Sequence, residues 1–309
     1  MTNTKYTELF FEWYVPDLHY LSTAIELEIL FIPIFIVNLF FFIFSFNSTS
    51  LKKRQYIKTY INTLAIHYLF LSILAFINCN WYIFAVIFGK GIHTLTCIII
   101  HHLQYILITS IATIPAIFAL YRVMLIVLNI KICITINCIL WFILNFSSLF
   151  EIIHILFFNS VIVESSVCGK YIFSQNKLIH LIRTAVILLS PVFALILNFV
   201  TFDFFKKRNR REPESNVIKR ERLILINITL QGILSILCQS PTAILTYLTQ
   251  AYLINIPNMY YLISNFLLFS HFGISTLITI IFLKDVRQEI CESFSGYVDH
   301  KLIKSFIKI

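Results

Sequence analysis

A single arginine stands at the end of a long apolar segment, where its charge is costly. The segment begins near Thr94 and reaches Arg122 in the stretch ALYRVML. A guanidinium group near a membrane interface needs an acidic partner, water or acceptors from a second protein. Glu221 lies just before the sixth apolar segment and could supply the acidic partner. The alternative is that the Arg122 side chain extends to lipid phosphates.

Two cysteines could form a disulfide on the opposite side of the same segment. Cys97 lies 25 residues before Arg122, so a helix would place the two residues about 37 Å apart. Cys168 lies in the loop ESSVCGKY, which we expect on the oxidising side of the membrane, where disulfides form. A bond between Cys97 and Cys168 would tie this loop over the third segment as a lid. The alternative is two unpaired cysteines.

The composition places the chain in a membrane. Hydrophobic residues make up 59% of the 309 residues and only 13% are charged, which is too apolar for a soluble domain. A spanning helix needs about 20 mostly apolar residues, and the sequence has seven such segments. It therefore predicts an all-α membrane protein in a lipid bilayer, one seven-transmembrane helix bundle over 1–309 with tails at 1–24 and 284–309. The expected spans are 25–46, 60–82, 91–120, 132–156, 178–205, 223–248 and 259–283.

The basic residues predict the orientation of the bundle. Most of the 24 lysines and arginines fall in alternate connections, including the loop from Lys206 to Arg222. Lys and Arg resist translocation, so we expect the N-terminus outside and the C-terminus in the cytoplasm. This topology explains the net charge of +9, and no nucleic-acid partner is expected. The basic residues expected on the outer side are Lys5, Lys90, Lys170, Lys177 and Arg183.

The sixth span contains a proline in the stretch LCQSPTAIL. Pro241 removes one backbone hydrogen bond and kinks the helix, so neighbouring polar groups must bind the released backbone groups. Gln239 and Ser240 are the nearest candidates, and Pro191 has the same effect in the fifth span. The prolines predict hinges, although proline is also simply more common in membrane helices than in soluble ones.

Taken together, these positions resemble the rhodopsin-like family of G-protein-coupled receptors. In that family a cysteine begins the third helix, an arginine stands 25 residues later, and a tryptophan, a proline and a Cys-Trp-x-Pro motif follow in helices four to six. The short tails and the Phe- and Ile-rich spans look most like the divergent nematode serpentine chemoreceptors. The matching residues here are Cys97, Arg122, Trp141, Pro191 and the tetrad from Cys238 to Pro241.

The sequence departs from the family pattern at several positions. The triplet around the arginine reads Leu120, Tyr121, Arg122, so its usual acid is missing, and Gln239 replaces the tryptophan. Tyr68 occupies the position of the family's sodium-binding aspartate, and the seventh span contains no proline. These departures argue against a sodium-modulated switch and against the standard activation relay.

The resemblance implies a ligand pocket in the outer half of the bundle. His101, Gln104 and Tyr105 follow Cys97 by four, seven and eight residues and share its helix face, and Gln239 would form the pocket floor. The other polar candidates at this depth are His102 and His154. For each histidine the alternative is a hydrogen bond between helices. No metal or cofactor is expected, because adjacent helical residues such as His101 and His102 point about 100° apart.

The family mechanism implies that Arg122 leaves Glu221 when the sixth helix swings outward at Pro241, which opens a cytoplasmic cleft for a heterotrimeric G protein. The expected ligand is a small, odorant-like chemical cue, and the expected location is the plasma membrane as a multi-pass protein. No enzymatic activity is expected.

Two other classes of protein remain as alternatives. A ligand-gated cation channel of the insect chemoreceptor type has its N-terminus inside, which would place most of the basic residues outside. A small-solute transporter or a membrane enzyme needs carboxylates within the membrane, whereas the acids near the spans all lie toward span ends. These acids are Glu151, Asp203 and Glu221.

Overall fold

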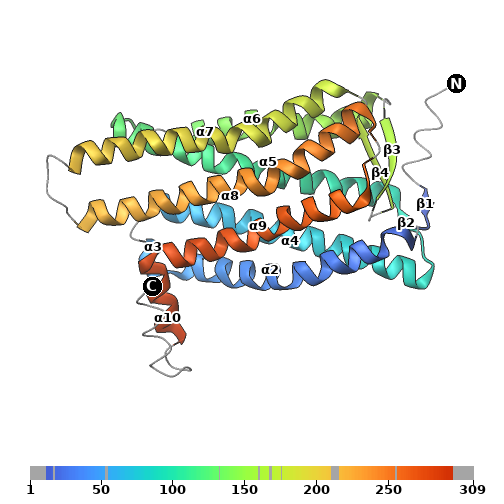
Figure 1. Ribbon diagram of the computed structural model, residues 1–309, viewed down its shortest axis with the longest axis horizontal. Helices are drawn as coiled ribbons and strands as arrows, with labels where there is room; N and C mark the ends of the chain where they lie inside the picture. Colours follow the sequence, from blue (N-terminus) through green and yellow to red (C-terminus); the bar gives the residue numbers. More distant parts are fainter. Residues whose placement is uncertain are drawn as a thin grey trace.

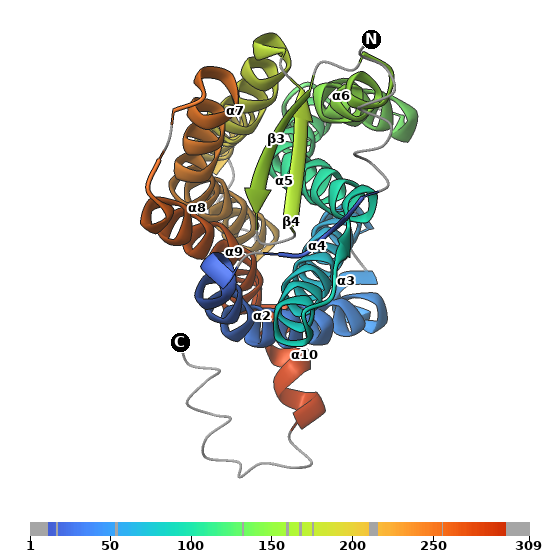
Figure 2. The same cartoon turned by 90° about the vertical axis from the view of Figure 1, so that its right-hand side faces the viewer.

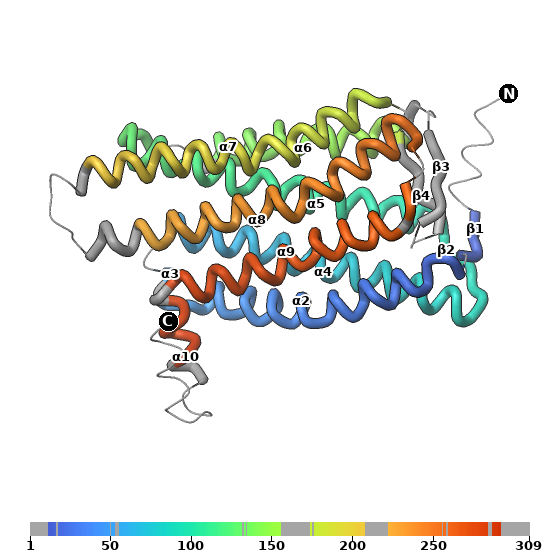
Figure 3. The backbone as a smooth tube through the Cα atoms, viewed as in Figure 1, coloured from blue at the N-terminus to red at the C-terminus, as the bar shows by residue number. Residues whose placement is uncertain are grey.

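The computed structural model describes residues 12–16, 18–52, 55–131, 133–158, 161–166, 169–174, 176–209, 216–254 and 256–294. Within these ranges, seven helices are long and apolar enough to cross a membrane, which confirms the predicted number of spans and a bilayer environment. They lie side by side along the long axis of the molecule (Figures 1 and 3). The seven are α2 (Leu21–Asn47), α4 (Gln55–Phe88), α5 (Thr94–Arg122), α6 (Ile134–Phe158), α7 (Lys177–Asn209), α8 (Asn216–Tyr252) and α9 (Asn258–Phe282).

Several helices extend beyond the apolar segments that the sequence indicates. Helix α7 continues to Asn209 and α8 already begins at Asn216, so both run into the basic connection. A hydropathy pattern detects only the apolar part of a helix, which lies in the lipid. The helix can continue beyond it in water, because Lys, Arg and Glu are good helix formers. The predicted spans therefore locate the membrane segments better than they locate the helix ends.

Short elements distinguish the two ends of the bundle. At one end, strand β3 (Val161–Ser166) pairs antiparallel with β4 (Gly169–Ser174), and this hairpin lies across the mouth of the bundle (Figure 2). Strand β4 packs against α5 and α6. We call this the hairpin end. The same end holds β1 (Trp13–Tyr14), which pairs with β2 (Ile92–His93), and the 3₁₀ turn η1 (Leu18–Tyr20).

The opposite end carries a helix that turns away from the bundle axis (Figure 1). This helix is α10 (Lys284–Phe294), and we call its end of the bundle the α10 end. Glu289 of α10 accepts hydrogen bonds from the Ser48 hydroxyl, at 2.6 Å, and from the Thr49 backbone N–H, at 2.7 Å. These bonds join α10 to the short helix α3 (Thr49–Lys52), and a carboxylate at the start of a helix is stabilised by its dipole.

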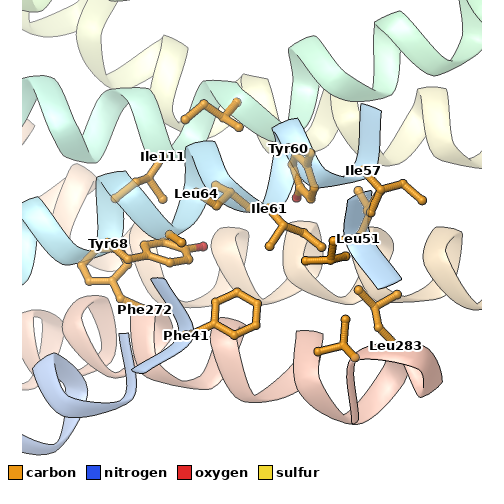
Figure 4. Close-up of a cluster of buried hydrophobic side chains, with 14 of the residues drawn as sticks. Phe41, Leu51, Ile57, Tyr60, Ile61, Leu64, Tyr68, Ile111, Phe272 and Leu283 are labelled. Atoms are coloured by element: carbon orange, nitrogen blue, oxygen red, sulfur yellow. The ribbon is translucent and has the colours of Figure 1, made fainter. Parts of the chain in front are cut away.

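The distribution of side chains is that of a membrane protein. Large apolar side chains such as Phe199, which is 73% exposed, cover the outside, whereas polar side chains such as Thr113 and Asn145 are fully buried. An apolar core at the α10 half joins α2, α4, α5, α8 and α9, and Figure 4 shows part of it. Since lipid provides no hydrophobic force between helices, small and polar residues supply much of the helix contact.

Helix α5 is the central helix, because it packs against α4, α6 and α7. Its contact with α6 is polar: the Ser110 hydroxyl donates to Asn145 Oδ1 at 3.1 Å, and Asn145 Nδ2 donates to the Thr113 hydroxyl at 3.4 Å. At its α10 end, α5 passes directly into the π-helical turn η2 (Val123–Val127). Such turns are rare and are often found at functional sites.

Candidate functional site

A buried pair of opposite charges lies in the hairpin half of the bundle. Arg183 of α7 and Glu151 of α6 are 2% and 0% exposed, and Arg183 Nη1 donates a hydrogen bond to Glu151 Oε2. Each residue lies about 10 Å inside its helix, counted from the helix end nearest the hairpin. The sequence analysis placed Arg183 among the outer-side charges and Glu151 toward a span end. Neither expectation foresaw that the two charges neutralise one another inside the bundle.

The Arg183 guanidinium contacts three further side chains. Its Nη2 donates to Gln250 Oε1 of α8 and lies 3.4 Å from His180 Nδ1 on its own helix. The centre of the guanidinium lies 4.5 Å from the centroid of the Tyr105 ring of α5, in a cation–π contact. One cation therefore joins α5, α6, α7 and α8. We call these residues the Arg183 cluster: Tyr105, Glu151, His180, Arg183 and Gln250.

His180 connects the Arg183 cluster to the hairpin. Its Nε2 lies 2.6 Å from the Ser174 carbonyl oxygen, and a carbonyl only accepts, so Nε2 carries the proton. In the neutral ring Nδ1 then accepts from Arg183. The Ser174 hydroxyl accepts from the Asn176 backbone N–H at 3.0 Å and shares a hydrogen bond with His154 Nδ1 at 2.9 Å. The end of β4 is thus bound to both α6 and α7 above the charge pair.

The structure places the predicted ligand residues of the third helix at this same end. Tyr105 belongs to the Arg183 cluster, and His102 is buried and interacts electrostatically with His180. Gln104 is buried and His101 is half-buried. From the fourth helix, His154 contacts the hairpin through Ser174.

Gln239 lies apart from this group, in the interface between α8 and α9. Its Nε2 lies 3.4 Å from His271 Nδ1, and the His271 ring packs edge-on against Tyr68. The polar side chain that binds a carbonyl beside Pro241 is Ser240, whose hydroxyl donates to the Ile236 carbonyl oxygen. The carbonyl that Pro241 releases is that of Leu237, four residues earlier. Of the two candidates that the sequence offered for it, Ser240 binds the preceding carbonyl, that of Ile236, and Gln239 contacts His271.

Arg122 lies inside the bundle at the α10 end. It is 1% exposed and lines a small cavity together with Tyr60, Phe118 and Asn227, among other residues. It also interacts electrostatically with the Tyr60 hydroxyl. This burial excludes the alternative in which the side chain extends to lipid phosphates. The side chain of Glu221 lies outside the described residues, so the Arg122 to Glu221 pair stays a prediction.

A hydrogen-bonded bridge beside this cavity joins three helices. The Tyr60 hydroxyl of α4 donates to Gln231 Oε1 of α8 at 2.8 Å, and Gln231 Nε2 donates to the Thr279 hydroxyl of α9 at 2.6 Å. Gln231 is 3% exposed, so these bonds form away from solvent. None of these three residues was predicted as a site residue from the sequence.

Cys97 is fully buried in the first turn of α5. The cysteines with free thiols in the described part of the chain do not include it. Cys168 lies outside the described residues, so its bond to Cys97 stays a prediction. The described free thiols are Cys79, Cys133, Cys138, Cys238 and Cys291.

His180, Arg183 and Gln250 were not predicted as site residues, and Glu151 was predicted to lie too near a span end for a role in the membrane. A usable signal was present, since opposite charges stood at a similar depth in two neighbouring spans, and ionisable residues within spans usually mark a site. Among the described residues, no three His, Cys, Asp or Glu side chains are grouped to hold a metal ion.

No protein-family model matches the chain, and no curated protein matches it significantly. The case for a function therefore rests on the geometry of the chain itself.

Proposed function

We propose that the protein is a seven-helix receptor of the G-protein-coupled type, which binds a small chemical cue at the hairpin end and opens a G-protein cleft at the α10 end. The observation that carries the proposal is the double attachment of α8. Gln250 binds Arg183 at the hairpin end, and Gln231 bridges Tyr60 and Thr279 at the α10 end. One helix thus contacts both the proposed ligand site and the proposed cleft.

Ligand binding would act by changing the balance between two positions of α8. A ligand that binds beside Arg183 and Glu151 changes how Arg183 holds Gln250, and so changes the attachment of the hairpin end of α8. Pro241 lies between the two attachments and provides a point at which the helix can bend. The ligand shifts the equilibrium only by as much as it prefers one position, and a change from 1% to 99% open requires about 5.5 kcal/mol.

The charge distribution supports this orientation. Described basic side chains gather toward the α10 end of the helices, which is where the positive-inside rule places the cytoplasm. We therefore propose that the hairpin end is extracellular and the α10 end cytoplasmic. The described basic side chains toward the α10 end include Lys52, Lys58, Arg122, Lys206, Lys207, Arg222 and Arg287.

A small-solute transporter is the second candidate, and one observation favours it. Glu151 and Arg183 form an intramembrane charge pair of the kind that transport pathways use. An uptake assay separates the two candidates, since a transporter accumulates labelled solute in cells without any G protein.

The test of the receptor is a second-messenger assay in cells challenged with a panel of odorants. We expect wild-type protein to respond and Arg122→Ala to lose the response at equal surface expression, because Arg122 lines the α10-end cavity. The matched control is Lys207→Ala, which removes an exposed basic residue that pairs with Asp203 on the same helix. An unchanged response of Arg122→Ala would remove this residue from the mechanism.

A further inference from the structure

One oxygen atom of the Arg183 cluster is left without a hydrogen bond. Glu151 Oε2 accepts from Arg183, but Glu151 Oε1 accepts no hydrogen bond within the described part of the chain, although it is fully buried. His180 Nδ1 lies 3.8 Å from this oxygen, too far for a hydrogen bond. In the neutral ring this nitrogen carries no proton, because the proton is on Nε2. A buried carboxylate oxygen without a hydrogen-bond donor destabilises the folded protein, and binding a donor would remove this cost.

Both terminal nitrogens of Arg183 already have partners. Arg183 Nη1 binds Glu151, Nη2 binds Gln250 and faces His180, and the Tyr105 ring covers the guanidinium. The group that the cluster can still bind is therefore a hydrogen-bond donor. An added acceptor would have to displace one of these bonds.

Charge restricts the ligand further. Arg183 and Glu151 neutralise each other, so the site carries no net charge while His180 is neutral. An ammonium group would place a second cation beside Arg183 in a medium of low dielectric constant. A carboxylate ligand would have to separate Arg183 from Glu151, and an unpaired buried charge is strongly unfavourable. A neutral donor satisfies Glu151 Oε1 without either cost.

We propose that the Arg183 cluster binds an uncharged, mainly apolar small molecule through a hydroxyl or similar neutral donor, which gives its hydrogen bond to Glu151 Oε1. This inference rests on the proposed function for its location at the ligand site, and it adds the chemical class of the ligand. The flanking ring of Tyr105 and the apolar spans provide contacts for the hydrocarbon part of such a molecule.

The experiment measures binding without signalling. Full-length protein is purified in detergent, and its thermal unfolding is followed with four probes that share one alkyl chain: the alcohol, its methyl ether, the amine and the carboxylate. We expect the alcohol to stabilise the protein and to bind about 10- to 100-fold more tightly than the ether, since only the alcohol donates a hydrogen bond to a charged acceptor.

The decisive variant is the double substitution Glu151→Gln with Arg183→Gln, which removes both charges and leaves neither unpaired. Its preference for the alcohol should fall well below that of the wild type, because the amide oxygen left at position 151 is a neutral and therefore weaker acceptor. The matched control Asp203→Asn removes an exposed carboxylate of α7 and should keep the preference for the alcohol. If the double variant does not fold, Glu151→Asp is tested in its place. This substitution keeps the negative charge but moves the carboxylate oxygens toward the backbone of α6, so it should also reduce the preference for the alcohol over the ether.

Two results would overturn the inference: equal binding of alcohol and ether by the wild-type protein, or tighter binding of the amine or the carboxylate. The proposed function fails separately. Alcohol binding without any second-messenger response would leave the ligand class standing and remove the receptor mechanism. A response to odorants that is insensitive to Glu151→Asp would leave the receptor mechanism standing and remove the proposed ligand class.

Discussion

Arg183 and Glu151 illustrate how much one residue pair can organise inside a membrane bundle. The pair joins α6 to α7, and through Gln250 and Tyr105 it reaches α8 and α5. A buried ion pair is weak evidence for stability, because the cost of removing both charges from water offsets their attraction. The presence of this pair beneath the hairpin therefore argues for a role in binding.

The first prediction concerns the two charges separately and together. Glu151→Gln should destabilise the protein by about 3 to 5 kcal/mol, because it leaves Arg183 charged and unpaired in the bundle. The double variant with Arg183→Gln should cost much less. Thermal unfolding of the purified protein measures both, with Asp203→Asn as a control expected to change stability by less than about 1 kcal/mol. Equal losses in the single and double variants would contradict the pairing.

The second prediction concerns the bridge at the α10 end. Tyr60→Phe removes the hydroxyl that binds Gln231, which should weaken the attachment of α8 by about 1 kcal/mol. A loss of about 1 kcal/mol from the closed state raises the ratio of open to closed receptor about fivefold. Signalling without ligand should therefore rise by a similar factor. Basal second messenger per receptor at the surface measures this. Tyr260→Phe, at a 59% exposed position, is the control and should change nothing.

At the scale of the element, α8 combines a rigid and a deformable part. It runs unbroken from Asn216 to Tyr252, yet Pro241 interrupts its backbone hydrogen bonds between the Gln231 and Gln250 attachments. Ser240 binds a carbonyl on the same turn, and Thr242 donates to the Ser264 carbonyl of α9 at 2.9 Å. These bonds hold the interrupted turn in one geometry, from which the helix can bend.

The third prediction tests this bend. Pro241→Ala restores a backbone donor and should stiffen α8, which lowers the maximal signalling response several-fold while ligand affinity changes little. Dose–response curves and binding curves on the same membranes separate the two quantities. Pro33→Ala in α2 is the matched control, because Pro33 also lies within a helix but far along the chain from both attachments. A loss of affinity without loss of maximal response would assign Pro241 to the ligand site.

At the scale of the whole molecule, the bundle is apolar outside and polar inside. Polar contacts occur at several levels, among them the Arg183 cluster near the hairpin, the α5 to α6 contact around Asn145, and the Gln231 bridge near α10. Helix α8 belongs to both the Arg183 cluster and the Gln231 bridge, so its displacement at one end can reach the other end through packed contacts. This arrangement suits a receptor that responds to a cue on one side of a membrane.

The fourth prediction concerns the orientation of this bundle. An epitope added before Met1 should be labelled on intact cells, and one added after Ile309 only after permeabilisation, because the basic residues near α10 favour the cytoplasm. The reverse pattern at good surface expression would favour the channel class with its N-terminus inside. Labelling of the C-terminal epitope in permeabilised cells measures the total amount of protein and serves as the expression control.

The sequence by itself determined the seven spans, because the cost of placing a helix in lipid is a sum over its own residues and needs no partner. It also determined that Arg122 and Pro241 would lie within or at the ends of spans. The helix ends in the basic connection were less well predicted, since no change in hydropathy marks where a helix stops in water.

Only the tertiary structure decided which polar residues meet. Arg183 finds Glu151 and Gln250, which lie 32 and 67 positions away in the chain, and Gln239 contacts His271 on the next helix. A shift of one residue turns a helical side chain by about 100°, so partners depend on how each helix is rotated and placed beside its neighbours. That rotation results from the packing of all seven helices together, and no single span encodes it.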